Sequence, residues 1–276
     1  MLQKNKAVIL LVFFFNISFC ILAQNITLPV CKNRFIVIAH RGDHTNAAEN
    51  TLTAYQNAID AGADFVEIDL RTTKDSQLVI MHNSTINYMT EAKGNVSDYM
   101  FDSLRKIPVH DPQHPEWGKY TIPTFKEVLQ LCKGKINIYL DFKNASVKSA
   151  YHEIVNAGME RNVIVYINEV HQFAEWRNIA PAMPLMISLP SQIKTKHEMY
   201  ALLDSLQIDI LDGNFDEYNI ATVLAAKEKN IPIWADIQSK DENAERWDRA
   251  LVLGLAGLQT DHPAALIGYL KLKGMR

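Results

Sequence analysis

Two acidic side chains stand two residues apart in FVEIDLRTTKDSQLVIMHN, residues 65–83. Side chains alternate between the faces of a β-strand, so Glu67 and Asp69 share a face if this segment begins as a strand. A second expected strand, INIYLDF, ends with Asp141 and Phe142. Three carboxylates in one buried site repel one another unless a positive charge lies between them, and oxygen ligands suit a hard divalent cation. The sequence therefore predicts a site for Ca²⁺ or Mg²⁺ formed by these three acids.

The same acids have a second interpretation that needs no metal. Arg71 follows Asp69 by two residues, and Lys143 follows Asp141 at the same spacing. These cations could form a network of ion pairs with the acids instead. The relative positions of the acids and cations distinguish the two interpretations.

The second half of the opening segment returns a histidine to the acids. A turn centred near Asp75 makes the segment a β-hairpin, and pairing about that centre places His82 opposite Ile68. His40 and Arg41 directly follow another expected strand, residues 35–39. Because histidine titrates near neutrality, two histidines beside a cation and an arginine can act as base and acid in phosphoryl transfer.

Short apolar runs alternate with amphipathic segments along the chain. The runs expected to be strands are residues 35–39, 63–70, 136–142, 162–167, 184–189, 208–211, 231–237 and 256–260. Each is followed by a segment with helical spacing, such as ENTLTAYQNAIDAG at residues 49–62. Eight strand–helix units of this size predict an α/β fold of the (β/α)8 TIM barrel type. A doubly wound sheet is disfavoured because no Gly-rich dinucleotide loop follows the first strand.

One connection is much longer than the others. It separates Leu70 from the helix expected at residue 123, and it is rich in turn formers and aromatic residues. We interpret residues 83–121 approximately as a small insertion after strand 2, beside the barrel mouth. The carboxyl ends of barrel strands face the active site, so the acids and histidines above are expected to meet there.

The N-terminal residues have the composition of an export signal. Lys4 and Lys6 precede a long apolar run that ends in a small residue. This pattern predicts a signal peptide over residues 1–23, a catalytic domain over residues 32–276, and a periplasmic or secreted protein with no stable membrane span after signal removal. A membrane anchor and a lipoprotein attached through Cys20 are the alternatives.

The net charge bears on nucleic-acid binding, and the cysteines bear on a possible disulfide. The formal net charge of −3 argues against nucleic-acid binding, which needs a basic surface. Without the signal, the chain keeps Cys31 and Cys132, which could form one disulfide or remain as buried thiols.

Five segments together resemble the glycerophosphodiester phosphodiesterase family: AHRGDHTNAAENT, FVEIDLRTTKDSQLVIMHN, INIYLDFK, PIWADI and GLAGLQTDHP. The resemblance runs from about residue 34 to the C-terminus. It implies a TIM barrel with a small insertion after strand 2. It also implies divalent-cation-dependent cleavage of a glycerol-linked phosphodiester into an alcohol and glycerol phosphate.

The resemblance implies a role for each matching residue. The positions that match a general base and acid pair and three metal ligands are His40 and His82, then Glu67, Asp69 and Asp141. The positions that match two phosphate contacts and an aromatic packed on the glycerol end are Arg41, Lys143 and Trp234. Glu49 lies in the motif at a helix start, where a carboxylate can cap and orient.

Two positions depart from the family pattern. Asn83 stands where an Asp usually follows the second histidine, which keeps a hydrogen-bond acceptor but removes a charge. We therefore expect a shifted pH optimum or a slower reaction. Asp141 stands where a Glu is usual, and it retains the carboxylate with a shorter side chain.

The expected reaction is hydrolysis through a cyclic phosphate, in which one histidine deprotonates the glycerol 2-hydroxyl and the other protonates the leaving alcohol. A lipid-directed phospholipase of C or D type is one alternative, suggested by Tyr99, Met100, Phe101 and Trp117 in the insertion. A non-catalytic phosphodiester-binding relative is another, suggested by Asn83. The sequence leaves the headgroup, the native cation and the oligomeric state open.

Overall fold

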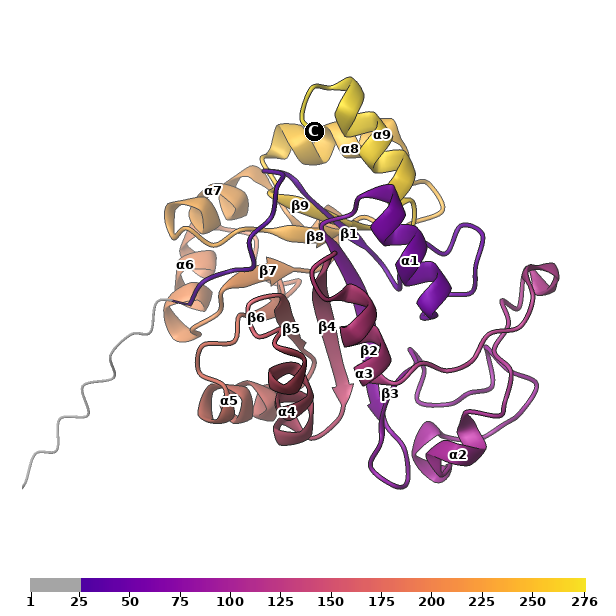
Figure 1. Ribbon diagram of the computed structural model, residues 1–276. Coiled ribbons are helices and arrows are strands. Elements are labelled where there is room, and N and C mark those ends of the chain that lie inside the picture. Colours follow the sequence, from indigo (N-terminus) through magenta and orange to yellow (C-terminus); the bar gives the residue numbers. More distant parts are fainter. Residues whose placement is uncertain (1–25) are drawn as a thin grey trace, which may run out of the picture.

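A nearly closed barrel of parallel strands forms the centre of the computed structural model, which describes residues 26–276 (Figure 1). The barrel strands are β1 (Ile36–Ala39), β2 (Phe65–Thr72), β4 (Asn137–Asn144), β5 (Val163–Ile167), β6 (Leu185–Ser188), β7 (Ile210–Asp212), β8 (Trp234–Asp236) and β9 (Gly257–Thr260). They pair in the order β7-β6-β5-β4-β2-β1-β9-β8. Parallel bridges from Leu211 to Ile233 and from Asn214 to Asp236 bring β7 beside β8. The predicted (β/α)8 barrel is confirmed.

Helices surround the barrel in the described part of the chain. They are α1 (Leu52–Ala61), α3 (Phe125–Cys132), α4 (Val147–Ala157), α5 (Val170–Ile179), α6 (Lys196–Ser205), α7 (Ile220–Glu228), α8 (Ala244–Leu253) and α9 (Pro263–Leu272). The helix expected from residue 49 begins at Leu52, because the Thr51 hydroxyl caps it by accepting from the main-chain N–H of Ala54 at 3.2 Å.

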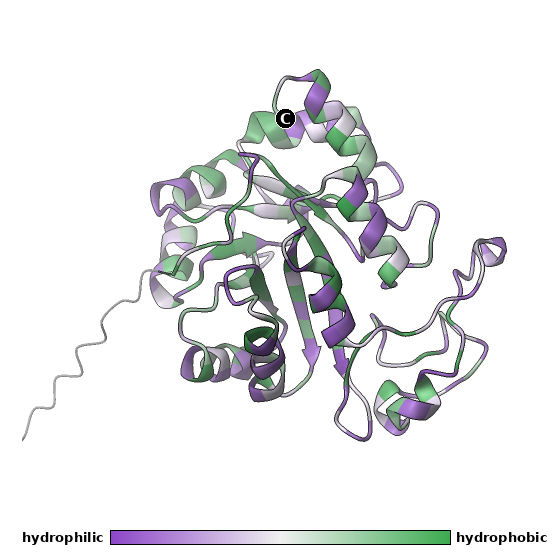
Figure 2. Cartoon of the chain, viewed as in Figure 1, coloured by the Kyte–Doolittle hydropathy of each residue, from purple (hydrophilic) through white to green (hydrophobic). Residues whose placement is uncertain are grey.

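Apolar side chains fill the barrel, and polar ones take over toward its mouth. Figure 2 shows hydrophobic strands that become hydrophilic toward the arrowheads of β2 and β4. Fully buried interior side chains include Ile38, Phe65, Ile164 and Met186. Burial of each such side chain contributes about 1.5–3 kcal/mol to folding. This packed interior is a rigid base for the polar groups above it.

The hairpin predicted from the sequence has the expected register. β2 pairs antiparallel with β3 (Leu78–Ile80), and Leu70 lies opposite Ile80. The main-chain N–H of Met81 donates to the Asp69 carbonyl at 3.0 Å, so the next residue, His82, comes level with Ile68. The hairpin therefore returns His82 to the acids.

The insertion after the second barrel strand forms a small unit with its own core. It contains the short helices η1 (Val96–Asp98), α2 (Phe101–Leu104) and η2 (Pro115–Trp117), and Figure 1 shows it standing beside the barrel. Tyr99 and Phe101 pack against this core, whereas Met100 is 49% exposed. Arg105 joins the insertion to α3 through two hydrogen bonds to Glu127, at 2.6 and 2.7 Å.

Several expectations concern the chain ends and cysteines. The predicted signal peptide and Cys20 lie outside the described residues. In residues 26–276, none of the helices combines the length and apolar character needed to cross a bilayer. Cys31 and Cys132 are free thiols, and Cys132 is buried. Of the two alternatives, a disulfide or separate thiols, the structure has separate thiols.

Candidate active site

A cavity of about 250 Å³ opens at the carboxyl ends of the barrel strands. Six of the residues singled out in the sequence line it: His40, Glu67, Asp69, His82, Asp141 and Lys143. Seven further residues, from β4 and β5 and from the strands opposite the triad, also line it: Tyr139, Tyr166, Asn168, Asp212, Asp236, Gln238 and Gln259. The strands thus bring together residues separated by more than a hundred positions in the chain.

The three predicted metal ligands converge. Glu67, Asp69 and Asp141 each offer an oxygen that lies within 4.8 Å of the other two. Asp69 is fully buried, and its Oδ1 accepts no hydrogen bond, although Lys143 Nζ lies 3.2 Å away. A buried acceptor without a partner costs free energy unless a cation or donor meets it. The donor set and this free oxygen fit a hard divalent cation.

Protein cations also approach the acids, as the alternative interpretation expected. Lys143 Nζ pairs with Asp141 and Asp69. Arg71, by contrast, does not join the acids and donates to the main-chain oxygen of His82 at 2.5 and 3.0 Å. The acids are therefore only partly neutralised by side chains, because Glu67 receives a hydrogen bond from the Arg41 main chain but no Lys or Arg side chain lies within 4.0 Å of it in the described residues.

The electrostatics of the triad reflect this partial neutralisation. Burial raises the pKa of Glu67 well above its usual range, with added repulsion from Asp69 and Asp141. Burial also opposes ionisation of Asp69, but Lys143 and other neighbouring positive groups outweigh it and lower its pKa. Burial and then Asp69 raise the pKa of Asp141. A divalent cation among these oxygens would favour the ionised form of each.

His40 is held by an acid from the far end of the chain. Its Nδ1 lies 2.6 Å from Oδ1 of Asp261, which follows β9. The main-chain N–H of His40 donates to the Thr260 carbonyl at 3.1 Å, so β1 and β9 fix the backbone as well. Asp261 stands in the GLQTDHP segment, but its partner could not be read from local spacing.

The His82 ring is oriented by the residue that follows it. Its Nδ1 lies 2.9 Å from Oδ1 of Asn83, the residue that departs from the family pattern. Burial lowers the pKa of His82, and Arg41 and Lys143 act in the same direction against the attraction of Asp69. The imidazole is therefore held largely neutral near pH 7.

Arg41 occupies a constrained position at the end of β1. Its φ of 53° lies in the left-handed region, and Gly42 follows with φ of 87°. A Cβ on Gly42 would lie 2.7 Å from the main chain of Ala54, so only glycine lets the turn approach α1. Arg41 donates twice to Glu49, at 2.8 and 2.9 Å, and its Nε has no hydrogen-bond partner. Glu49 orients Arg41, and Thr51, not Glu49, caps the helix.

Two asparagines that the sequence did not identify support the triad. Asn50 Nδ2 donates to Asp69 Oδ2 at 2.7 Å, and Tyr55 in turn donates to Asn50 Oδ1 at 2.7 Å. Asn168 Nδ2 donates to Asp141 Oδ1 at 2.6 Å. Asn50 lies in the Glu-Asn-Thr motif, which was a usable signal, whereas Asn168 follows β5 without any local pattern.

Trp234 does not lie where the resemblance implied. It is 4% exposed, and its ring packs 5.0 Å from that of Phe65 inside the barrel. It pairs with Gly257 at the start of β9, where a Cβ would come within 3.0 Å of the indole. The indole thus fills space left by a glycine below the cavity, and Asp236, two residues further along β8, lines the cavity instead.

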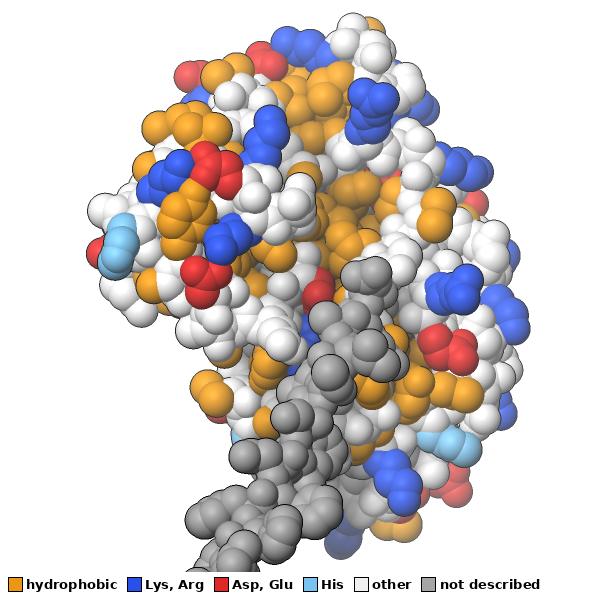
Figure 3. Space-filling model, turned by 90° about the vertical axis from the view of Figure 1, so that its left-hand side faces the viewer, with side chains coloured by type: hydrophobic (Ala, Val, Ile, Leu, Met, Phe, Trp, Pro, Cys, Tyr) orange, Lys and Arg blue, Asp and Glu red, His pale blue; other side chains and the backbone are white. Residues whose placement is uncertain are grey.

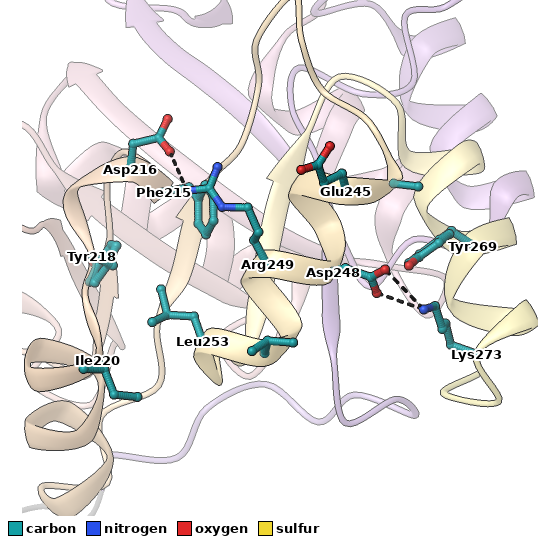
Figure 4. A pocket seen from close by; sticks show the side chains of 12 residues that line it. Phe215, Asp216, Tyr218, Ile220, Glu245, Asp248, Arg249, Leu253, Tyr269 and Lys273 are labelled. Carbon is teal, nitrogen blue, oxygen red and sulfur yellow. Dashed lines mark hydrogen bonds and ion pairs between the residues drawn. The ribbon is translucent and has the colours of Figure 1, made fainter.

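A larger hollow lies outside the barrel. It measures about 940 Å³ and is lined by residues of η3 (Phe215–Glu217), α7, α8 and α9 (Figure 4). Four of its charged groups form ion pairs, Asp248 with Lys273 and Arg249 with Asp216. Figure 3 shows one outer face, where hydrophobic side chains gather around a hollow with charged groups nearby. None of the candidate catalytic residues lines the 940 Å³ hollow, so size alone does not identify the active site.

Known proteins resemble this chain in sequence and in fold. The chain is 25% identical over 248 residues to a protein from Caldanaerobacter subterraneus named glycerophosphodiester phosphodiesterase, covering 87% of this chain and 99% of the relative. It is 28% identical over 239 residues to a protein of the same name from Bacillus altitudinis, covering 82% and 94%.

Solved structures agree. A glycerophosphodiester phosphodiesterase from Agrobacterium tumefaciens superposes with a TM-score of 0.75 at 18% identity, covering 85% of this chain and 99% of that one. An Oleispira antarctica phosphodiesterase in complex with the product sn-glycerol-3-phosphate gives 0.71 at 19% identity, covering 86% and 96%. The profile of the Glycerophosphoryl diester phosphodiesterase family matches residues 40–265, which include both histidines and the acid triad, and the chain belongs to this family.

Proposed function

We propose that this protein hydrolyses glycerophosphodiesters to an alcohol and glycerol phosphate. The observation that carries the proposal is one cavity in which an acid triad, two histidines and Lys143 meet, with Arg41 beside it. The chain belongs to the family, and its relatives are named glycerophosphodiester phosphodiesterases; both observations support the same reaction.

Glu67, Asp69 and Asp141 would hold one divalent cation, Ca²⁺ or Mg²⁺. Such a cation supplies Lewis-acid stabilisation of the negative charge on the phosphoryl oxygens. The free Oδ1 of Asp69 and the close approach of the three carboxylates support this assignment. Asn50 and Asn168 would keep two of the carboxylates in place through their hydrogen bonds.

Arg41 and Lys143 would contact the phosphate. The Nε of Arg41 lies 3.7 Å from Asp69 Oδ2 but makes no hydrogen bond, so it is a buried donor that an anionic oxygen would satisfy. Lys143 keeps its charge, because Asp69 and Asp141 raise its pKa against the effect of burial. Both groups can therefore balance charge on the phosphoryl oxygens as the reaction proceeds.

His40 and His82 would transfer the protons. One imidazole removes the proton of the glycerol 2-hydroxyl, which attacks phosphorus, and the other protonates the departing alcohol oxygen. Water then opens the cyclic phosphate with the two roles exchanged. Asp261 and Asn83 each hold one Nδ1, so each ring keeps a fixed orientation.

An activity panel tests the proposal. Hydrolysis of glycerophosphocholine, glycerophosphoethanolamine and glycerophosphoinositol should require a divalent cation and stop with a chelator. His40→Ala should lower kcat by roughly 10²–10⁴-fold, whereas His197→Ala, an exposed histidine on α6, should not change it. Full activity after metal removal contradicts the cation role, and a normal rate in His40→Ala contradicts the proton-transfer role.

Two further measurements test the alternative functions, a lipid-directed phospholipase and a non-catalytic binding protein. Lysophospholipids in place of the deacylated diesters report a lipid-directed enzyme, which would cleave them faster. Tight binding without turnover under every divalent cation would indicate a non-catalytic relative.

We also propose that the protein is exported to the periplasm or secreted. Lys4, Lys6 and the following apolar run support this location. Mass spectrometry of the protein from fractionated cells should find a chain beginning near Gln24. A full-length chain in the cytoplasmic fraction would contradict export, and a lipid on Cys20 would indicate an anchored lipoprotein.

A further inference from the structure

A second pair of acids lies on the wall of the cavity opposite the triad. Asp212 ends β7 and Asp236 ends β8, and these strands are neighbours. In the ring of eight strands, β7 and β8 lie three or four places from β2 and β4, which carry the triad. Both acids line the same cavity as the triad.

This wall contains buried acceptors without donors. Asp212 is 2% exposed, and Tyr139 reaches across from β4 to donate to its Oδ2 at 2.5 Å, but Oδ1 has no hydrogen-bond partner. Gln259, which is 5% exposed, donates through Nε2 to Asp236 Oδ1, and its own Oε1 has no partner. Buried acceptors are normally satisfied, so two on one cavity wall indicate that a donor binds between them.

The charges of the wall are also unbalanced. Five carboxylates and one lysine line the cavity, and that lysine, Lys143, pairs with Asp69 and Asp141 on the triad side. In residues 26–276, no Lys or Arg nitrogen lies within 4.0 Å of the Asp212 or Asp236 carboxylate. A carboxylate pair with one buried member, Asp212, and one half-buried member, Asp236, attracts a positive charge.

We propose that Asp212 and Asp236 bind the positively charged amino group of an amino-alcohol headgroup. This inference rests on the proposed function: with the phosphate at the triad, one end of the diester lies across the cavity, and the acidic wall favours the end that carries a positive charge. A primary ammonium supplies both the charge and the N–H donors that the free oxygens of Asp212 and Gln259 need. Neutral hydroxyls supply donors only, and a quaternary ammonium supplies charge only. The rings of Tyr139 and Tyr166, 5.9 Å apart, line the cavity beside the acids and add favourable contact with a cation.

Three diesters that differ in the headgroup test this inference. The wild-type kcat/KM should be about tenfold or more higher for glycerophosphoethanolamine than for the neutral glycerophosphoglycerol, with glycerophosphocholine between them. In Asp236→Asn, the preference for the amine should largely disappear, because the amide keeps the hydrogen bond from Gln259 but loses the charge. Glu245→Gln removes one charge in the outer hollow and should keep the preference.

Binding separates this inference from the proposed function. Calorimetry of the His82→Ala protein with glycerophosphoethanolamine and glycerophosphoglycerol measures recognition without turnover, and the melting temperature of each variant checks its folding. Equal kcat/KM for amine and neutral diesters, with equal affinities, overturns the inference while the proposed function stands. If no diester is cleaved, a tighter affinity for the amine that Asp236→Asn removes still supports the inference, and equal affinities overturn it.

Discussion

Asp69 and Asp212 lie on opposite acidic walls of the cavity at similar burial, yet their electrostatics differ. On the β2 and β4 wall, Lys143 and other positive groups outweigh burial and lower the pKa of Asp69. On the β7 and β8 wall, burial and the neighbouring Asp236 raise the pKa of Asp212 well above its usual range. Asp69 and Asp212 are 0% and 2% exposed, so burial does not explain the difference.

The comparison shows that the placement of cations decides what a buried carboxylate can do. Asp69 remains ionised and can bind a metal, because Lys143 and Arg41 lie nearby. Asp212 has the Tyr139 hydroxyl and the neighbouring Asp236 carboxyl as its side-chain partners, and it favours a proton or a bound cation. One cavity therefore presents, on one side, the triad that we propose holds an inorganic cation and, on the other, the acidic wall that we propose binds an organic one.

The largest expected effect comes from removing a ligand on the triad wall. Asp69→Asn should weaken Ca²⁺ or Mg²⁺ binding by more than about 100-fold, since even changes behind metal ligands cost 10–100-fold. Asp212→Asn, the matched change on the opposite wall, should leave metal affinity within a few-fold of wild type. Titration calorimetry measures both, and equal losses in the two variants would contradict the division of the walls.

Asp69 and Asp212 should also respond to pH with opposite signs. The lowered pKa of Asp69 means that its ionised form stabilises the fold above the unfolded pKa of about 3.9, and that this stability is lost as pH falls through the lower folded pKa. The raised pKa of Asp212 means that stability is present below about pH 3.9 and is lost as pH rises toward the folded pKa.

Melting temperatures in the presence of chelator test these signs. Asp69→Asn should melt lower than wild type at pH 7, with a smaller difference near pH 3. Asp212→Asn should gain relative to wild type between pH 4 and 7. For a chain of this size, each kcal/mol shifts the melting temperature by roughly 2–4 °C. The same sign for both variants would contradict the assignment.

A smaller effect should come from Asn83. Asn83→Asp restores a charge next to His82 Nδ1, which stabilises the protonated imidazole. The acidic limb of the kcat/KM profile should move to higher pH by roughly one unit or less, with a change in maximal rate of a few-fold. Asn46→Asp, a change of the same type on a residue that does not line the cavity, is the control and should leave the profile unchanged. An unchanged profile in Asn83→Asp would show that this position does not tune His82.

Most of the fold followed from local pattern. Alternating apolar strands and amphipathic helices predicted the barrel, because each periodicity reflects which side of an element faces the core. The turn centred near Asp75 predicted the register that returns His82, since a hairpin pairs residues symmetrically about its turn. The acids at strand ends followed from the rule that these ends share one mouth.

The contacts that complete the site depend on tertiary structure. Asp261 meets His40 across 221 positions, and Tyr139 meets Asp212 across 73. The resemblance assigned Trp234 to the glycerol end of the site, but the depth of its side chain in the barrel depends on the pairing of β8 with β9. The sequence alone thus determined the fold, the triad and the two histidines. Only the closed barrel decided which distant groups neutralise, orient or leave unpaired each buried charge, because those distances depend on how all eight strands pair around the ring.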